Sequence, residues 1–132
     1  MKLEKKYISF QDDRGSIIDI IESFNFNGAT VITSKAGSIR GNHFHKKTIQ
    51  YAFVLEGKIL AKSKKVGMNL EEVTLEPGDL ISHDFYEAHM FEALVDSKFL
   101  VLSSGLRTGK DYELDTFRLN SLIEDFSEAD IK

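Results

Sequence analysis

Short runs rich in Val, Ile and Phe recur along the chain, separated by clusters of Gly, Asn, Asp and Ser. Several runs alternate apolar and polar positions, as strands with one buried face do. The runs span 6–10, 16–22, 29–34, 49–55, 58–64, 70–75, 80–83, 89–94 and 98–103, and a further strand lies within 37–45. About ten short strands with frequent turns predict an all-β sandwich or barrel.

The C-terminal part has a different pattern. Apolar residues at helical spacing within 116–126 predict one short amphipathic helix on the outside of the sheets. These residues are Leu119, Leu122, Ile123 and Phe126. We find no internal repeat or linker, so residues 1–132 are expected to form a single domain.

Composition narrows the function classes. The chain has 42% apolar residues, a formal net charge of −4 and no cysteine. Its basic residues form no stripe, which argues against a nucleic-acid partner. No apolar run approaches the ~20 residues of a membrane helix, and residues 1–6 lack the apolar core of a signal peptide. We therefore expect a cytoplasmic protein without membrane contact, in which any metal has nitrogen and oxygen ligands.

Candidate chemistry lies in the histidines. His43 and His45 are two residues apart in a strand, so their side chains share one face. His89 lies on a later strand and is positioned to close the same site. Metal ligation and proton transfer are the two roles this pattern suggests, although one histidine can also simply satisfy a hydrogen-bond network in the core. His83 fits either the rim of the same pocket or a surface turn.

The spacing of Gly37, His43-x-His45, Gln50 and Gly57 resembles the first cupin motif, with Gln50 at the usual glutamate position. Residues 78–93 resemble the second cupin motif more loosely, with His89 at the metal-histidine position. The resemblance implies a single jelly-roll β-barrel whose core motifs span 37–57 and 78–93.

In such a barrel alternate residues face inward. We expect His43 and His45 on one strand, Gln50 on its hairpin partner and His89 on a strand across the barrel. These four residues would form a neutral ligand set suited to a divalent transition metal. Zn is the first choice, and Ni, Fe or Cu are also compatible.

A narrower resemblance rests on residues 12–15, 40–46, 110–113 and 115–117. They look like the cupins of nucleotide-sugar and polysaccharide biosynthesis. These include the dTDP-sugar 3,4-ketoisomerases, the C-terminal cupin of capsular polysaccharide synthesis proteins and, more distantly, the dTDP-4-dehydrorhamnose 3,5-epimerases. The resemblance implies an isomerase or epimerase that acts on a nucleotide-linked keto-sugar.

The related cupins imply two versions of the site. The capsular cupins bind zinc, and in that version proton transfer falls to His83, Tyr86 or Glu87. The ketoisomerases use their histidines as acid and base without metal, and His43 or His45 is then the base. Arg40 suits a bidentate contact to a sugar oxygen or phosphate, or is a solvated residue at a strand end.

Two functions of other kinds remain possible alternatives to an isomerase or epimerase on the basis of the sequence. One is a non-catalytic cupin module that binds metal or a sugar-like ligand, and the other is a metal-dependent dioxygenase. The resemblance also implies a homodimer that pairs through sheet edges, with the N-terminal strand as an exchange element.

Overall fold

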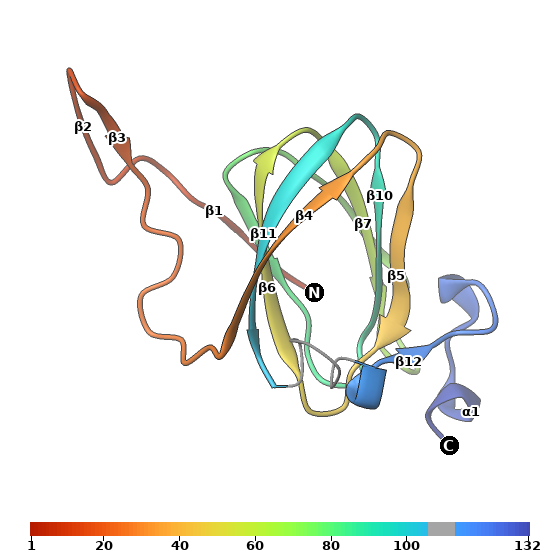
Figure 1. The fold of residues 1–132 in the computed structure, drawn as a ribbon. Helices are drawn as coiled ribbons and strands as arrows, with labels where there is room; N and C mark the ends of the chain where they lie inside the picture. Colours follow the sequence, from red (N-terminus) through yellow and green to blue (C-terminus); the bar gives the residue numbers. More distant parts are fainter. Residues whose placement is uncertain (106–112) are drawn as a thin grey trace.

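The computed structural model describes residues 1–105 and 113–132. As Figure 1 shows, most strands belong to two sheets that face each other. The first sheet has the order β1-β9-β6-β11-β4 and the second has the order β12-β5-β10-β7-β8. The strands are β1 (Lys2–Lys5), β2 (Phe10–Asp12), β3 (Gly15–Ile17), β4 (Gly28–Ser34), β5 (Ile39–Phe44), β6 (Ile49–Glu56), β7 (Ile59–Lys64), β8 (Glu71–Leu75), β9 (Asp79–Ser82), β10 (Ala88–Ala93), β11 (Ser97–Ser104) and β12 (Phe117–Arg118).

The prediction of an all-β fold is confirmed, and the eight strands from β4 to β11 lie within a few residues of their predicted positions. The barrel, however, is not closed by hydrogen bonds. β4 ends the first sheet and β12 ends the second, and the two do not pair. The fold is therefore a two-sheet jelly roll rather than a closed barrel.

The core lies between the sheets because alternate residues of each strand point inward. In β7, Ile59, Ala61 and Ser63 are buried, while the residues between them are partly exposed. The buried apolar side chains from both sheets form one cluster, consisting of Ala52, Val54, Ile59, Ala61, Leu75, Ile81, Phe99 and Val101.

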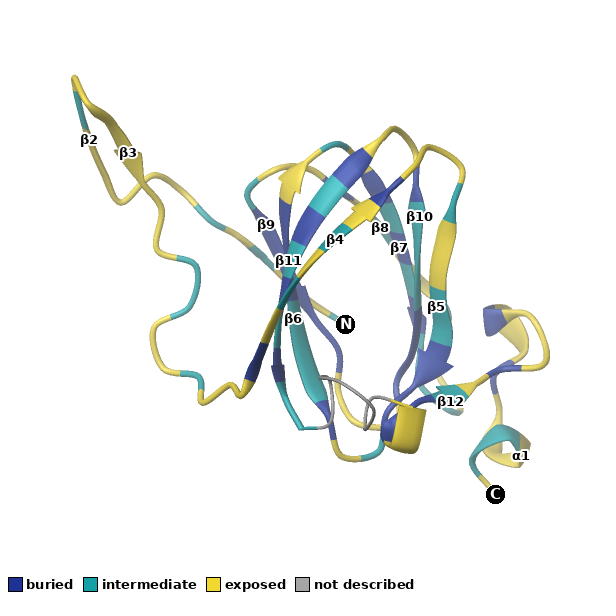
Figure 2. Ribbon diagram, in the orientation of Figure 1, coloured by how far each residue is buried: buried dark blue, intermediate teal, exposed yellow. Residues whose placement is uncertain are grey.

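The N-terminal segment departs from the predicted strands at 6–10 and 16–22. β1 pairs with β9, whereas β2 and β3 form a separate hairpin that projects away from the two sheets in Figure 1. Figure 2 shows this hairpin as almost wholly exposed. Residues 18–22 form no strand, despite their β-branched composition.

The predicted helix over 116–126 is wrong. Residues 117–118 form β12 on the edge of β5, Ile123–Asp125 is a 3₁₀ turn, and the only α-helix of the described residues is α1 (Glu128–Ile131). Leu119, Ile123 and Phe126 pack on the outer face of the second sheet, against Phe44 and Ala88. An irregular segment therefore buries three of the four residues whose spacing suggested a helix, while Leu122 is exposed. No helix of the described segments has the length and apolar character that crossing a membrane requires.

The expected hairpin between the histidine strand and the Gln50 strand is also wrong. β5 pairs with β10 and β12, whereas β6 pairs with β9 and β11. The turn after His45 therefore carries the chain from one sheet to the other. As a result His89 lies beside His43 in the same sheet, and Gln50 lies on the facing sheet.

Candidate active site

Three histidines converge between the sheets. His43 and His89 are directly opposite each other in the pairing of β5 with β10, and His45 lies just beyond the end of β5. The ring centroid of His43 lies 4.8 Å from that of His45 and 4.7 Å from that of His89. The ring centroids of His45 and His89 are 5.2 Å apart. All three side chains are buried, and one ring nitrogen of each lies within 4.8 Å of the others.

Backbone carbonyl groups fix two of these rings. The Nδ1 atom of His45 is 2.8 Å from the carbonyl oxygen of Asp115, and that of His89 is 3.0 Å from the carbonyl oxygen of Glu87. A carbonyl oxygen only accepts hydrogen bonds, so Nδ1 carries the proton in both rings. Each Nε2 then keeps its lone pair, which is the form that binds a metal or accepts a proton.

Burial favours the neutral form of the cluster. It lowers the pKa of His89 to about 3, with a smaller contribution from the nearby His45. It also holds the pKa of His83 well below its usual value, and the neighbouring His89 adds to this effect. Both imidazoles are therefore neutral at pH 7.

His83 occupies neither the pocket rim nor a surface turn. Its ring stacks on His89 at a centroid distance of 4.4 Å and an interplanar angle of 15°. The side chain is 9% exposed, and its Nε2 has no hydrogen-bond partner among the described residues. His83 thus extends the histidine cluster into the interior.

A cavity of about 380 Å³ opens onto His43 and His89. Gln50 reaches it from β6 on the facing sheet. The rest of its lining is largely apolar, with arginines at two positions: Ile32, Ile39, Arg40, Gly41, Phe91, Phe99, Val101 and Arg118. A pocket in which apolar side chains surround a few convergent polar groups is the usual form of a small-molecule site.

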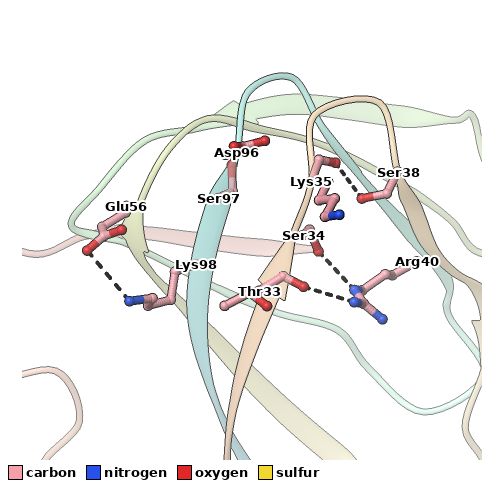
Figure 3. Close-up of a pocket in the computed structure, with 9 residues that line it drawn as sticks. All are labelled: Thr33, Ser34, Lys35, Ser38, Arg40, Glu56, Asp96, Ser97 and Lys98. Atoms are coloured by element: carbon pink, nitrogen blue, oxygen red, sulfur yellow. Dashed lines mark hydrogen bonds and ion pairs between the residues drawn. The ribbon is translucent and has the colours of Figure 1, made fainter.

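Arg40 lies between this cavity and a second, more open one of about 630 Å³, and it lines both. Its Nε donates to Ser34 Oγ and its Nη2 donates to the carbonyl oxygen of Thr33, each at 2.8 Å. Figure 3 shows these two bonds at the second cavity, beside the ion pair of Lys98 with Glu56. These two hydrogen bonds hold the guanidinium in place.

Arg118 was missed by the sequence reasoning. It lines the histidine cavity, lies opposite His43 in the pairing of β12 with β5, and forms a 2.6 Å ion pair with Glu113. The helix predicted over 116–126 places Arg118 on the outside of the sheets, where its side chain would point to solvent. For this reason the sequence did not identify it as a site residue. Its position directly after 115–117, a segment that resembles the related cupins, was the available signal.

Tyr86 and Glu87 do not line the cavity. The Tyr86 ring stacks on Phe44 at 6.2 Å, on the outer side of the second sheet. Glu87 is fully buried, and its carboxylate accepts hydrogen bonds from the amino group of Met1, Ser63 Oγ and the backbone N–H of Asp84. Neither side chain is positioned to exchange a proton with a ligand in the cavity.

The donor set fits a divalent transition metal. Three imidazoles converge, and two of them have their Nδ1–H groups bound to carbonyl oxygens, as metal-bound histidines commonly do. Three nitrogen ligands with the amide of Gln50 in the same cavity would leave an open coordination position.

Comparisons with known proteins agree with this architecture. The model of the family described as polysaccharide biosynthesis C-terminal domain matches residues 10–103. No curated protein matches the chain. Residues 110–112, part of the segment used for the resemblance, lie outside the described residues.

Several solved structures share the fold. A dTDP-4-dehydrorhamnose 3,5-epimerase from Sulfolobus tokodaii superposes with a TM-score of 0.76 and 19% identity, covering 98% of this chain and 86% of that one. The sugar 3,4-ketoisomerase QdtA from Thermoanaerobacterium thermosaccharolyticum, in complex with TDP, has a TM-score of 0.74 and 21% identity, covering 90% and 88%. The 3'-monoepimerase ChmJ from Streptomyces bikiniensis, in complex with dTDP-quinovose, has a TM-score of 0.75 and 17% identity, covering 89% and 68%.

The match over residues 10–103 and the shared two-sheet fold lead to one conclusion: this chain belongs to the polysaccharide biosynthesis C-terminal domain family and has the cupin fold of the dTDP-sugar epimerases and ketoisomerases.

Proposed function

We propose that the protein is an isomerase or epimerase that acts on a nucleotide-linked keto-sugar in polysaccharide biosynthesis. The observation that carries this proposal is the placement of His43 and His89 in the wall of a cavity that also contains Arg40 and Arg118. The proteins of similar fold include epimerases and a ketoisomerase, some of them crystallised with TDP or a TDP-sugar. Imidazoles can move protons, and guanidinium groups can bind the anionic oxygens of such a substrate.

The reaction requires removal of a proton from the carbon next to the sugar carbonyl. We assign the base to His43, which lines the cavity, whereas His45 does not. The C–H proton moves to His43 and the electron pair of that bond passes to the carbonyl oxygen, giving an enediolate. Nearby guanidinium donors would stabilise the new negative charge. Return of the proton to the former carbonyl carbon, together with transfer of the hydroxyl proton from one enediolate oxygen to the other, moves the carbonyl group. Delivery of a proton to the opposite face of the original carbon gives an epimer instead.

Exchange of solvent deuterium into a TDP-linked 4-keto-sugar tests this assignment. The native protein should incorporate deuterium next to the carbonyl, and His43→Asn should lower the exchange rate by at least about 10²-fold, the usual contribution of a positioned base. Glu92→Gln is the control and should keep the native rate, because Glu92 lies on β10, which pairs with the strand of His43, but does not line the cavity. Exchange that persists in a folded His43→Asn variant contradicts the role of His43.

A metal site is the second candidate, favoured by the three histidine nitrogens that lie within 4.8 Å of one another. His43, His45 and His89 would hold a divalent transition metal, with Gln50 in the same cavity. The metal, when bound, supplies a Lewis acid for a carbonyl or enediolate oxygen. His43 cannot then be the base, so the two candidates give it opposite roles.

Elemental analysis separates the two candidates. A metal protein should contain close to one zinc, nickel, iron or copper per chain, and His43→Ala/His89→Ala should lose it. Metal without deuterium exchange would indicate a binding module, and oxygen consumption by the iron-, nickel- or copper-loaded protein would indicate a dioxygenase. Equal metal content in the native and variant proteins removes the ligand assignment.

A homodimer accounts for the projecting N-terminal segment. The hairpin β2–β3 stands away from the sheets and exposes Phe10 and Ile17, and Tyr7 just before it is 77% exposed. An isolated two-stranded hairpin is at best marginally stable in water. A second copy of the chain would cover these side chains and give the hairpin a packing surface.

Native mass spectrometry tests the dimer. We expect a dimer of the native chain, and the charge introduced by Ile17→Asp in the hairpin should shift it to monomer without unfolding the two sheets. A native chain that remains monomeric at concentrations well above those used for activity assays rules out the dimer.

A further inference from the structure

Asp115 contacts the histidine cluster and the turn beside it at the same time. Its backbone carbonyl oxygen accepts the Nδ1–H of His45 at 2.8 Å. Its carboxylate accepts the backbone N–H groups of Lys46 at 3.0 Å and Lys47 at 2.9 Å. One buried residue of the C-terminal segment therefore holds both the ring of His45 and the two residues that follow it.

The carboxylate is the anchor of this arrangement. Burial acts to raise the pKa of the Asp115 carboxyl, but hydrogen bonds from Thr48 and from the backbone of Lys46 and Lys47 outweigh it, and the pKa lies below its usual value. The side chain is therefore ionised at neutral pH. Charged hydrogen bonds of this kind are stronger than neutral ones, so they fix the backbone of Asp115 relative to the turn. The carbonyl group that meets His45 is fixed with it.

The same arrangement occurs at His89. The carbonyl oxygen of Glu87 accepts the Nδ1–H of His89 at 3.0 Å, while its buried carboxylate accepts the backbone N–H of Asp84 at 2.9 Å. Two acidic residues from unrelated parts of the chain thus each orient an imidazole through the backbone and fix that backbone through the side chain. This repetition indicates that the carboxylates serve the orientation of the rings.

We propose that Asp115 is a positioning residue, whose buried carboxylate sets the orientation and the tautomer of His45 through its own backbone carbonyl group. Its effect on turnover or on metal affinity rests on the proposed function of the cluster, whereas its effect on the tautomer does not. Loss of a partner of this kind typically lowers activity or metal affinity by about 10–100-fold.

Three variants test the proposal. Asp115→Ala removes both hydrogen bonds to the turn, and Asp115→Asn keeps the shape of the side chain but turns one acceptor into a donor facing a backbone N–H. Asp125→Ala is the control, since it removes an exposed carboxylate from the same C-terminal segment. The readout is the long-range ¹H–¹⁵N correlation spectrum of the histidine rings, recorded without metal at one neutral pH.

In the native protein and in Asp125→Ala, His45 should show a single Nδ1–H tautomer with a slowly exchanging ring proton. In Asp115→Ala the ring should average between tautomers, and Asp115→Asn should be intermediate. In the metal-binding version of the site His45 is a ligand, and turnover should then fall by about 10–100-fold in Asp115→Ala, with KM changed far less because the substrate contacts remain. If the protein proves to have no turnover, the same fold-change is expected in Zn²⁺ affinity.

An unchanged tautomer of His45 in Asp115→Asn, or in a folded Asp115→Ala, overturns the proposal. If Asp115→Ala does not fold, the tautomer of His45 in Asp115→Asn is the deciding measurement. Averaged tautomers in an otherwise inactive protein would leave the positioning role intact and contradict only the proposed function.

Discussion

At the scale of single residues, Gly41 sets how closely β5 approaches β10 beside the histidines. Its φ of 91° is in the region that favours glycine, and a Cβ atom there would lie 2.8 Å from the carbonyl oxygen of His89. The pairing of the two strands shifts register between His89 and Met90, directly opposite this position. The glycine therefore permits the bulge from which His89 faces His43.

Gly41→Ala should destabilise the protein and displace His89. Gly37→Ala is the matched control, because Gly37 has a φ of 87° but nothing within 4 Å of an added Cβ. The backbone strain common to both should cost about 1–3 kcal/mol, and Gly41→Ala should cost more because of the contact with His89. Urea unfolding measures the costs and the His89 ring signals measure the displacement. Equal costs with unchanged ring signals would contradict this role of Gly41.

At the scale of elements, the C-terminal segment stabilises the strand that carries His43 and His45. β12 pairs with the end of β5, and the backbone N–H of Leu119 donates to the carbonyl oxygen of Asn42 at 2.9 Å. Phe126 is 1% exposed and lies 5.5 Å from the ring of Phe44, which projects from β5 to the opposite side from the histidines. The packing of Phe126 on Phe44 at the outer face of β5 therefore stabilises the strand that positions His43 and His45 at its inner face.

Phe126→Ala should loosen this segment. Removal of a buried phenylalanine ring typically costs about 3–5 kcal/mol, and hydrogen exchange should accelerate over 113–131 more than in the first sheet. Leu122→Ala is the control, since Leu122 is 69% exposed and belongs to the same predicted helix. Its cost should stay within about 0.5 kcal/mol. Comparable costs for the two variants would favour the helix that the sequence suggested.

At the scale of the whole molecule, neutral histidines between the sheets make stability depend on pH. The pKa values of His83 and His89 are lowered in the folded state, so the unfolded chain binds more protons than the folded one below the usual histidine pKa of about 6.5. Stability therefore falls as the pH falls below this value. The carboxyl groups with lowered pKa, such as Asp115 and Asp84, act in the same direction but only near pH 4 and below.

Chelator-treated protein should thus lose stability between pH 6.5 and 4.5, before the carboxyl groups protonate. Each of the two histidines should contribute up to about 1.4 kcal/mol per pH unit, the limit for one extra proton bound by the unfolded chain. Urea unfolding at several pH values measures the slope, and His83→Gln should remove about half of it. A stability that is flat or rises on acidification over this window would show that the rings are not held neutral.

Local sequence patterns were sufficient to predict the all-β class, most strand positions and the shared face of His43 and His45, because these depend on alternation along one strand. The tertiary structure decided which strands pair, and so placed His89 beside His43, Gln50 on the facing sheet and Tyr86 on the outside. It also brought Arg118 to the cavity and the carbonyl group of Asp115 to His45. Strand pairing depends on contacts between distant parts of the chain, and every residue has the same backbone carbonyl group. Neither can therefore be predicted from local sequence patterns.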